Sequence, residues 1–222
     1  MIYVTGDTHA NYNDFIKRIC NYPVKADDTV IVCGDFGFVW KSPRHRHLLE
    51  KLSALPFIIA FVDGNHEDFD LLKTYPVEKW NGGKVHRIAG NIFHLMRGQL
   101  FTIEGKTFFT MGGAYSRDKI LRTEGSNWWA EEIPSSEDYR TADETLKKCG
   151  YKTDYVITHT IPQSAIHYIG AVPDSQDAEL TGYFEWLYRK LDFRKWFAGH
   201  FHINRLVRDD IQILYDGVEI IE

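Results

Sequence analysis

Short apolar segments recur along the chain, and each of them ends in a group of polar residues. The segments are rich in β-branched and aromatic residues and show no apolar–polar alternation, which predicts strands that are buried on both faces. In open α/β sheets, binding sites lie at the carboxyl ends of such strands. The predicted strands comprise residues 2–5, 29–33, 57–62, 107–111, 155–158 and 196–198.

Amphipathic segments lie between these strands and predict helices. Phe15, Ile16 and Ile19 share one face of the first such segment. Ser135, followed by acidic residues in the first turn, is typical of a helix N-terminus. The predicted helices comprise residues 13–21, 42–53, 135–150 and 177–190.

Two stretches, residues 85–111 and 205–221, carry turn signals in place of helical periodicity, which predicts antiparallel hairpins. Together with the alternating strands and helices, they predict an α/β fold of two packed sheets flanked by helices. Because the chain has no internal repeat, low-complexity tract or linker, residues 1–222 are expected to form a single domain. The turn signals fall at residues 89–91, 97–98, 104–106, 209–210 and 216–217.

The composition is that of a packed globular protein. Of the 222 residues, 44% are hydrophobic and 14% aromatic, which is enough for one substantial core. The formal net charge of -5 gives no general attraction to nucleic acid or to anionic membranes. The N-terminal residues lack the features of a signal peptide, and no apolar run has the length of a transmembrane helix. We therefore expect a soluble, cytoplasmic protein with no membrane association.

The three cysteines, Cys20, Cys33 and Cys149, are far apart and odd in number. They form no CxxC pair and no disulfide framework, so free thiols in a reducing compartment are expected. Cys33 belongs to an apolar segment, which predicts a small buried hydrophobic residue in preference to a nucleophile.

Residue types that bind metal ions or transfer protons gather where the predicted strands end. Half of the ten histidines fall in these places, although the clusters cover only a small part of the chain. The clusters are Gly6-Asp7-Thr8-His9, Gly34-Asp35, Gly64-Asn65-His66-Glu67, Thr158-His159 and Gly199-His200-Phe201-His202.

Each cluster taken alone also has an ordinary structural interpretation. Asp7 and His9 could be a capping carboxylate and a surface imidazole, and a lone Gly-Asp such as that at Asp35 is a frequent turn. The pair His200 and His202 is more specific, because two imidazoles at i and i+2 suit Zn, Fe, Mn or Ni. The ordered combination of all five clusters makes one shared metal site the better interpretation.

In this order, the clusters resemble the DxH, GD, GNH, H and GHxH motifs of the calcineurin-like metallophosphoesterase superfamily. The resemblance extends from Asp7 to His202, which is nearly the whole chain. It implies a four-layer αββα sandwich of two mixed sheets flanked by helices. It also implies a binuclear metal-dependent enzyme that hydrolyses a phosphodiester or a phosphomonoester.

The resemblance further implies two divalent metal ions and a role for each site residue. Manganese is the first choice, and iron, zinc, nickel or cobalt remain open because Asp, Asn and His ligands admit all of them. A hydroxide bridging the ions would attack phosphorus, while His66 protonates or stabilises the leaving oxygen. The implied ligands are Asp7, His9 and His202 for one ion, Asn65, His159 and His200 for the other, and Asp35 between both.

One position departs from the GDxxDRG pattern of the protein-phosphatase branch. Phe38 stands in place of the second Asp, which in that branch orients the GNH histidine, and no Arg follows it. A protein Ser/Thr phosphatase is therefore disfavoured, whereas phosphodiesters and small phosphate esters remain open. Asp63, Asp68 and Asp70 are alternative candidates for orienting His66.

Residues 112–132 combine cationic side chains with two adjacent tryptophans. Arg117 and Arg122 are candidates for binding a substrate phosphate. Trp128 and Trp129 could stack on a flat substrate group or anchor the segment on the core, and the anchor is the preferred interpretation.

Two other functions compete with the enzymatic one. The first is a catalytically silent scaffold that uses this fold for protein–protein interaction; such relatives typically lose metal ligands or the GNH histidine, and this chain retains them. The second is a nuclease, which the small size and the negative charge disfavour for long nucleic acid but not for nucleotides. A small phosphate ester or nucleotide-type substrate is expected, and the sequence leaves the oligomeric state open.

Overall fold

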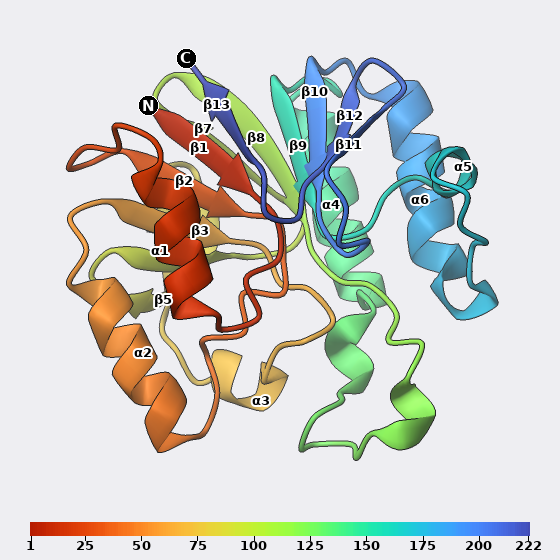
Figure 1. Cartoon of the computed structure of the whole chain (residues 1–222). Helices are drawn as coiled ribbons and strands as arrows, with labels where there is room; N and C mark the ends of the chain where they lie inside the picture. Colours follow the sequence, from red (N-terminus) through yellow and green to blue (C-terminus); the bar gives the residue numbers. More distant parts are fainter.

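The computed structural model describes residues 1–222 and has two β-sheets that pack face to face (Figure 1). The first sheet has seven strands and the second has six. In spatial order the first sheet contains β13 (Val218–Ile221), β1 (Ile2–Thr5), β2 (Thr29–Val32), β3 (Ile58–Phe61), β6 (Ile92–Leu95), β5 (Gly83–Ala89) and β4 (Val77–Trp80). The second contains β11 (Arg205–Val207), β12 (Ile211–Ile213), β10 (Lys195–Ala198), β9 (Tyr155–Thr158), β8 (Lys106–Met111) and β7 (Gln99–Ile103).

Both sheets are mixed, with a parallel centre and antiparallel edges. Strands β1, β2, β3 and β6 are parallel in the first sheet, and β8, β9, β10 and β12 are parallel in the second. The antiparallel neighbours are β13, β5 and β4 in the first sheet, and β11 and β7 in the second.

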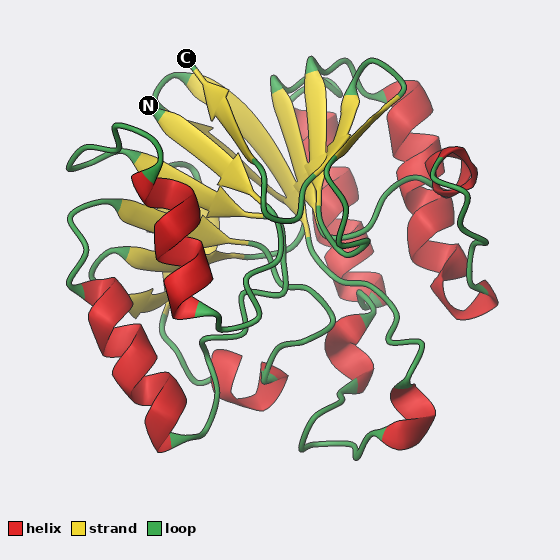
Figure 2. Cartoon of the chain, in the orientation of Figure 1, coloured by secondary structure: helices red, strands yellow, loops and turns green.

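Helices cover the outer face of each sheet, which completes the four-layer αββα sandwich expected from the family resemblance (Figure 2). The first sheet packs on α1 (Tyr12–Cys20), α2 (Pro43–Ser53) and α3 (Phe69–Leu72), and the second on α4 (Ser136–Lys148), α5 (Gln163–Tyr168) and α6 (Ala178–Lys190). Three short 3₁₀ helices complete the fold at Lys119–Leu121, Ala130–Glu132 and Ser175–Asp177.

The continuous apolar runs in the sequence follow from this layering. Along β1, Tyr3 belongs to the core under α1 and α2, whereas its neighbour Val4 belongs to the core between the two sheets. Val30 and Ile31 of β2 divide in the same way. Because successive side chains of a strand point to opposite faces, a strand covered on both sides must be apolar at every position.

The four predicted helices and six predicted strands are all present, with boundaries within two residues of those expected. The short elements α3, α5 and β4 were not predicted, because segments of four to six residues carry too little periodicity to be recognised.

Two of the predicted hairpin turns are crossovers between the sheets. The turns at 89–91 and 104–106 do join the antiparallel pairs β5–β6 and β7–β8. The turn at 97–98 instead carries the chain from β6 to β7 in the other sheet, and the turn at 216–217 carries it from β12 to β13 beside β1. A local turn signal does not reveal whether the next strand pairs with its predecessor, since that choice depends on packing between the sheets.

This topology brings the ends of five parallel strands to one place. The loops after β1, β2 and β3 meet those after β9 and β10 near the centre of the molecule, where the two sheets adjoin (Figure 1). The cysteines form no disulfide, and Cys33 is fully buried as predicted. None of the helices combines the length and apolar character that a bilayer-crossing segment requires.

Candidate metal centre

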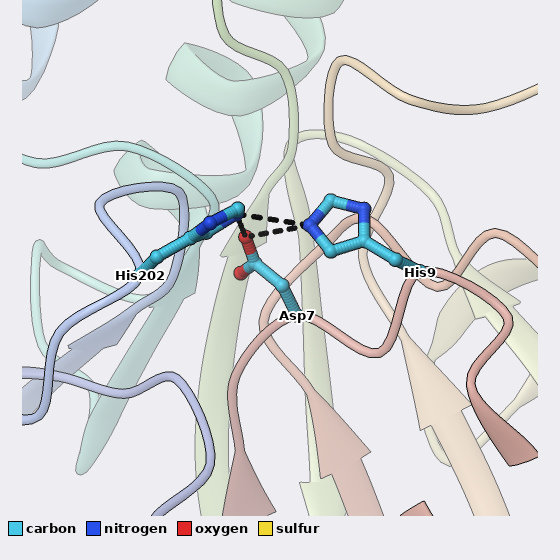
Figure 3. A group of neighbouring side chains, drawn as sticks. All are labelled: Asp7, His9 and His202. Carbon is cyan, nitrogen blue, oxygen red and sulfur yellow. Dashed lines mark hydrogen bonds and ion pairs between the residues drawn. The ribbon is translucent and has the colours of Figure 1, made fainter. Parts of the chain in front are cut away.

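The loops after β1 and β10 bring together Asp7, His9 and His202. The Nε2 atoms of the two histidines lie 2.9 Å apart, and Oδ2 of Asp7 lies 3.6 Å from that of His9 and 3.1 Å from that of His202. Figure 3 shows the two imidazoles turned toward one carboxylate from opposite sides. Asp7 is fully buried, whereas the two histidines are partly exposed, so this group opens toward solvent.

A second group forms deeper in the structure from Asn65, His159 and His200. Oδ1 of Asn65 lies 3.1 Å from Nε2 of His159 and 3.1 Å from Nδ1 of His200. The Nδ1–H of His159 donates to the carbonyl of Cys33 at 2.8 Å, which leaves Nε2 to face the site. Asn65 and His159 are buried, so this group is less accessible than the first.

Asp35, on the loop after β2, lies between the two groups. One of its carboxylate oxygens is 3.4 Å from Nε2 of His159, and the other is 3.8 Å from Nδ1 of His9. The first of these oxygens also accepts the backbone N–H of His66 at 2.8 Å. The carboxylate thus faces both groups at once, the position expected of a bridging ligand.

The backbone at the site is unusual. Four of the seven candidate ligands, His9, Asp35, His200 and His202, have positive φ angles between 44° and 69°. L-residues rarely adopt this left-handed conformation, and it tends to occur at functional sites, where the surrounding structure enforces it. Each of these residues lies in the loop that follows a strand, two to four residues beyond the end of that strand.

The glycines of the motifs provide room for ligands that come from other motifs. A Cβ on Gly64 would overlap the carboxylate and backbone of Asp35, and one on Gly199 would overlap the carboxylate of Asp7. The two glycines therefore permit close approach between loops that are far apart in the sequence.

The donor set fits divalent cations. Oδ2 of Asp7 is buried and accepts no hydrogen bond, although it lies beside two imidazole nitrogens. Around Asn65, a carbonyl-type oxygen converges with two imidazole nitrogens at hydrogen-bond distance. Carboxylate, amide oxygen and imidazole are the ligands that first-row divalent metals accept, and a cation would satisfy these converging lone pairs.

Without a cation, the site is an internal ion pair. Burial opposes the ionisation of Asp35, but the charge of His159 outweighs it and lowers the pKa of Asp35 to about 2. Burial likewise opposes the charge of His159, but Asp35 raises the pKa of His159 to about 10. Burial, reinforced by the charged His159, lowers the pKa of His200 to about 3. Because metal ligation requires neutral imidazole, cation binding here would release a proton.

His66 lies at the mouth of the same site. Its Nε2 is 4.0 Å from Asp35 and 3.4 Å from the guanidinium of Arg122. Burial lowers the pKa of His66; the charge of Asp35 opposes this effect and that of Arg122 adds to it. Phe38 lies in the core, packed against Phe36, so the position of the missing Asp faces away from solvent and charge.

The acidic residues considered as partners of His66 have other roles. Asp63 accepts hydrogen bonds from Arg97 and from His94, and Asp68 caps the N-terminus of α3. Neither of them, nor Asp70, hydrogen-bonds to His66, so none of these candidates orients the ring. The side chain nearest to that role is the cation Arg122.

Comparison with known proteins places the whole constellation in a family. A sequence model described as calcineurin-like phosphoesterase matches residues 1–204. The chain belongs to this family. A comparison with curated proteins finds no sequence match.

Two solved structures align with this member of the calcineurin-like phosphoesterase family at low sequence identity. A putative 5'-nucleotidase from Staphylococcus aureus, in complex with alpha-ketoglutarate, aligns with a TM-score of 0.50 and 15% identity over 98% of this chain and 49% of that chain. The phosphopantetheinyl hydrolase of Mycobacterium tuberculosis aligns with a TM-score of 0.46 and 17% identity over 96% of this chain and 87% of that chain. The chain thus spans about half the length of the nucleotidase structure.

A cleft of about 300 Å³ borders the candidate metal centre. Arg117 lies in its wall and donates to the carbonyl of Val172 at 2.9 Å. Arg122 is held by Asp118 through two hydrogen bonds, of 2.7 and 2.8 Å. Of the two predicted substrate-binding arginines, Arg117 therefore lines the cleft, whereas Arg122 contacts His66 without lining it.

The two tryptophans of this segment are not part of the cleft wall. Trp129 is buried against Trp40 and Phe69, which agrees with the anchor interpretation. The half-buried ring of Trp128 lies under the ammonium of Lys119, 3.8 Å from the ring centroid.

Sequence reasoning missed the residues that support the ligands. Glu67 accepts the backbone N–H groups of Phe36 and Gly37 and so fixes the loop that carries Asp35. Ser116 accepts a hydrogen bond from the side chain of Asn65 at 3.0 Å, across 51 residues of sequence. The position of Glu67 beside the GNH motif could have drawn attention to it, whereas nothing in the sequence distinguishes Ser116.

Proposed function

We propose that this protein hydrolyses a small phosphate ester, a phosphodiester or a phosphomonoester, with two divalent metal ions. Asp7, His9 and His202 would hold one ion. The second would be held by the buried group of Asn65, His159 and His200, with Asp35 bridging both.

One observation carries the proposal. Seven ligand-type side chains from five separate loops converge on one place, and Oδ2 of Asp7 is buried there with no well-formed hydrogen bond, beside the imidazole nitrogens of His9 and His202. A buried carboxylate oxygen without a partner is costly, because it has lost its hydration without gaining a hydrogen bond. A cation between Asp7, His9 and His202 removes that cost.

The charge of the donor set favours an anionic substrate. Asp7 and Asp35 contribute two negative charges, while Asn65 and the four ligating histidines contribute none when metal is bound. Two divalent ions would then leave an excess of two positive charges, or of one when a hydroxide bridges them, which favours an anionic phosphate ester. Such ions acidify a shared water and neutralise phosphoryl oxygens when they are bound in this type of site.

The residues around the ions would bind and protonate the substrate. We assign to His66 the hydrogen bond or proton that the leaving oxygen requires, because its ring faces the cleft beside Asp35. Arg122 and Arg117 would bind phosphoryl or other anionic groups of the substrate. The cleft lies at the lower end of the range for small-molecule sites, which supports a small ester or a nucleotide over long nucleic acid.

An assay of metal-loaded protein on paired aryl phosphate monoesters and diesters tests the proposal. Turnover that requires Mn²⁺, or another divalent metal, and that Asp35→Asn abolishes is the expected result. The preferred ester distinguishes a phosphatase from a phosphodiesterase. Equal turnover by wild type and Asp35→Asn would reveal a contaminant, and a metal-loaded protein inactive on all esters would favour the scaffold.

A further inference from the structure

The amide of Asn65 has two different ends, and only one of them can bind a cation. Its Oδ1 faces His159 and His200, while its Nδ2 donates to Oγ of Ser116 at 3.0 Å. If the amide were rotated by half a turn, its N–H groups would face the imidazole nitrogens and exclude a metal ion. A contact that fixes the Nδ2 end would therefore help to hold the amide in the metal-binding orientation.

Ser116 alone does not select it. A hydroxyl group can donate or accept, so it would satisfy either end of the amide. The choice depends on where the hydroxyl hydrogen of Ser116 is directed.

Glu132 supplies the missing direction. Its Oε2 accepts the backbone N–H of Ser116 at 3.2 Å, which places the carboxylate beside the hydroxyl group of the same residue. A carboxylate without a proton can only accept, so a Glu132 carboxylate in this position would draw the hydroxyl hydrogen of Ser116 toward itself. The lone pairs of Oγ then face Asn65, where only the Nδ2 end can donate to them.

The burial of Glu132 supports a specific role for its charge. Glu132 and Ser116 are each 1% exposed, and Oε1 of Glu132 is buried without a hydrogen-bond partner. A carboxylate in this setting destabilises the fold relative to an apolar side chain of the same size. Packing alone therefore gives no reason for an acid at this position.

We propose that Glu132, acting through Ser116, is a positioning residue that sets the orientation of the Asn65 amide and so builds the more buried cation site. The inference rests on the proposed function, because it takes Asn65 as a metal ligand. Supporting residues of this kind orient ligands that they do not themselves replace.

Stepwise titration with Mn²⁺ at pH 8, followed by calorimetry, tests this role without any substrate. Glu132→Gln keeps the size of the side chain but can donate to Ser116, so the direction of the hydrogen-bond chain is lost. We expect one of the two ions to bind about 10-fold more weakly in Glu132→Gln and in Ser116→Ala. Ser116→Thr, which restores the hydroxyl, should bind both ions like wild type.

Two further variants make the result specific. His200→Ala removes a ligand from the Asn65 side and identifies which titration step belongs to that ion. Thr110→Val removes another buried hydroxyl, which donates to the carbonyl of Met96, and should leave both steps unchanged.

The outcomes separate this inference from the proposed function. Wild type that takes up no Mn²⁺ would refute the function itself. Two ions bound equally by wild type and Glu132→Gln would overturn only the role of Glu132. The role of Glu132 would also be overturned if Glu132→Gln weakened both Mn²⁺ binding steps equally and Thr110→Val did the same, since that pattern reflects general destabilisation.

Discussion

The guanidinium of Arg122 lies 3.4 Å from Nε2 of His66, beside the candidate metal centre. A guanidinium has only donors, so in the substrate-free structure Nε2 of His66 faces it as an acceptor. Asp118 holds Arg122 in place through a two-pronged interaction. In this protein the partner of the GNH histidine, His66, is therefore the guanidinium of Arg122. In the protein-phosphatase pattern the partner of that histidine is a carboxylate.

Removing Arg122 should weaken substrate binding. Arg122→Ala is expected to raise KM for the preferred ester by about 10- to 100-fold, because a charge-assisted hydrogen bond to phosphate is lost. Arg122→Lys should restore little, since an ammonium cannot keep the fork with Asp118. Arg87→Ala is a matched control, because Arg87 is exposed and pairs with Glu78 away from the cleft. An unchanged KM in Arg122→Ala would remove this residue from the substrate site.

His66→Ala should separate chemistry from metal binding. We expect kcat to fall by about 10²- to 10⁴-fold, the usual contribution of a general acid, while both metal ions remain bound. The backbone N–H of His66 that donates to Asp35 persists in this variant, so the loop should keep its position. Metal content and kcat are the two measurements, and His167→Ala on the surface of α5 is the control. Loss of a metal ion would instead make His66 a ligand.

Glu132 should make the metal-free protein less stable as the pH rises. Burial raises the pKa of Glu132 to about 7 in the folded state, against an ordinary value of 4.5. Between these values the folded state binds more protons than the unfolded state, so the free energy of unfolding decreases with rising pH, by as much as ~3 kcal/mol. The stabilisation is present below the unfolded pKa and is lost as the pH passes through the folded one.

Denaturant unfolding at pH 5 and pH 8, with a chelator present, measures this effect. Glu132→Gln cannot titrate, so it should lose less stability than wild type between the two pH values. The same pH dependence in both proteins would show that Glu132 does not carry the effect.

Gly64→Ala should disrupt the metal centre by a steric route. The added methyl group would overlap the carboxylate and backbone nitrogen of Asp35, and the backbone cannot move aside cheaply. Overpacking of this kind costs about 1–3 kcal/mol of stability, and Asp35 should lose its bridging position. Metal content and thermal unfolding check the expectation. Gly90→Ala is the control, because a methyl group there meets open space, and it should match wild type in metal content and thermal stability. If Gly64→Ala behaved like Gly90→Ala, the steric explanation would be wrong.

Much of the architecture could be read from local patterns. Apolar runs such as 155–158 become strands because a strand covered on both faces needs apolar side chains at every position. The helix at Ser136–Lys148 begins after Ser135, whose side chain forms the predicted cap. The order of the donor motifs was also sufficient to identify the family. In each case the information lies within a few neighbouring residues.

Other features depended on contacts between distant segments. The turns at 97–98 and 216–217 look like hairpins, yet they cross between sheets because the strands that follow pair elsewhere. His9 and His202 meet across 193 residues, and Ser116 meets Asn65 across 51. The pattern along the chain determined which donors exist and that they follow strands. Only packing of the two sheets decided which donors face each other, and why Arg122 and Glu132 lie beside them, because loop geometry and long-range burial leave no local signature.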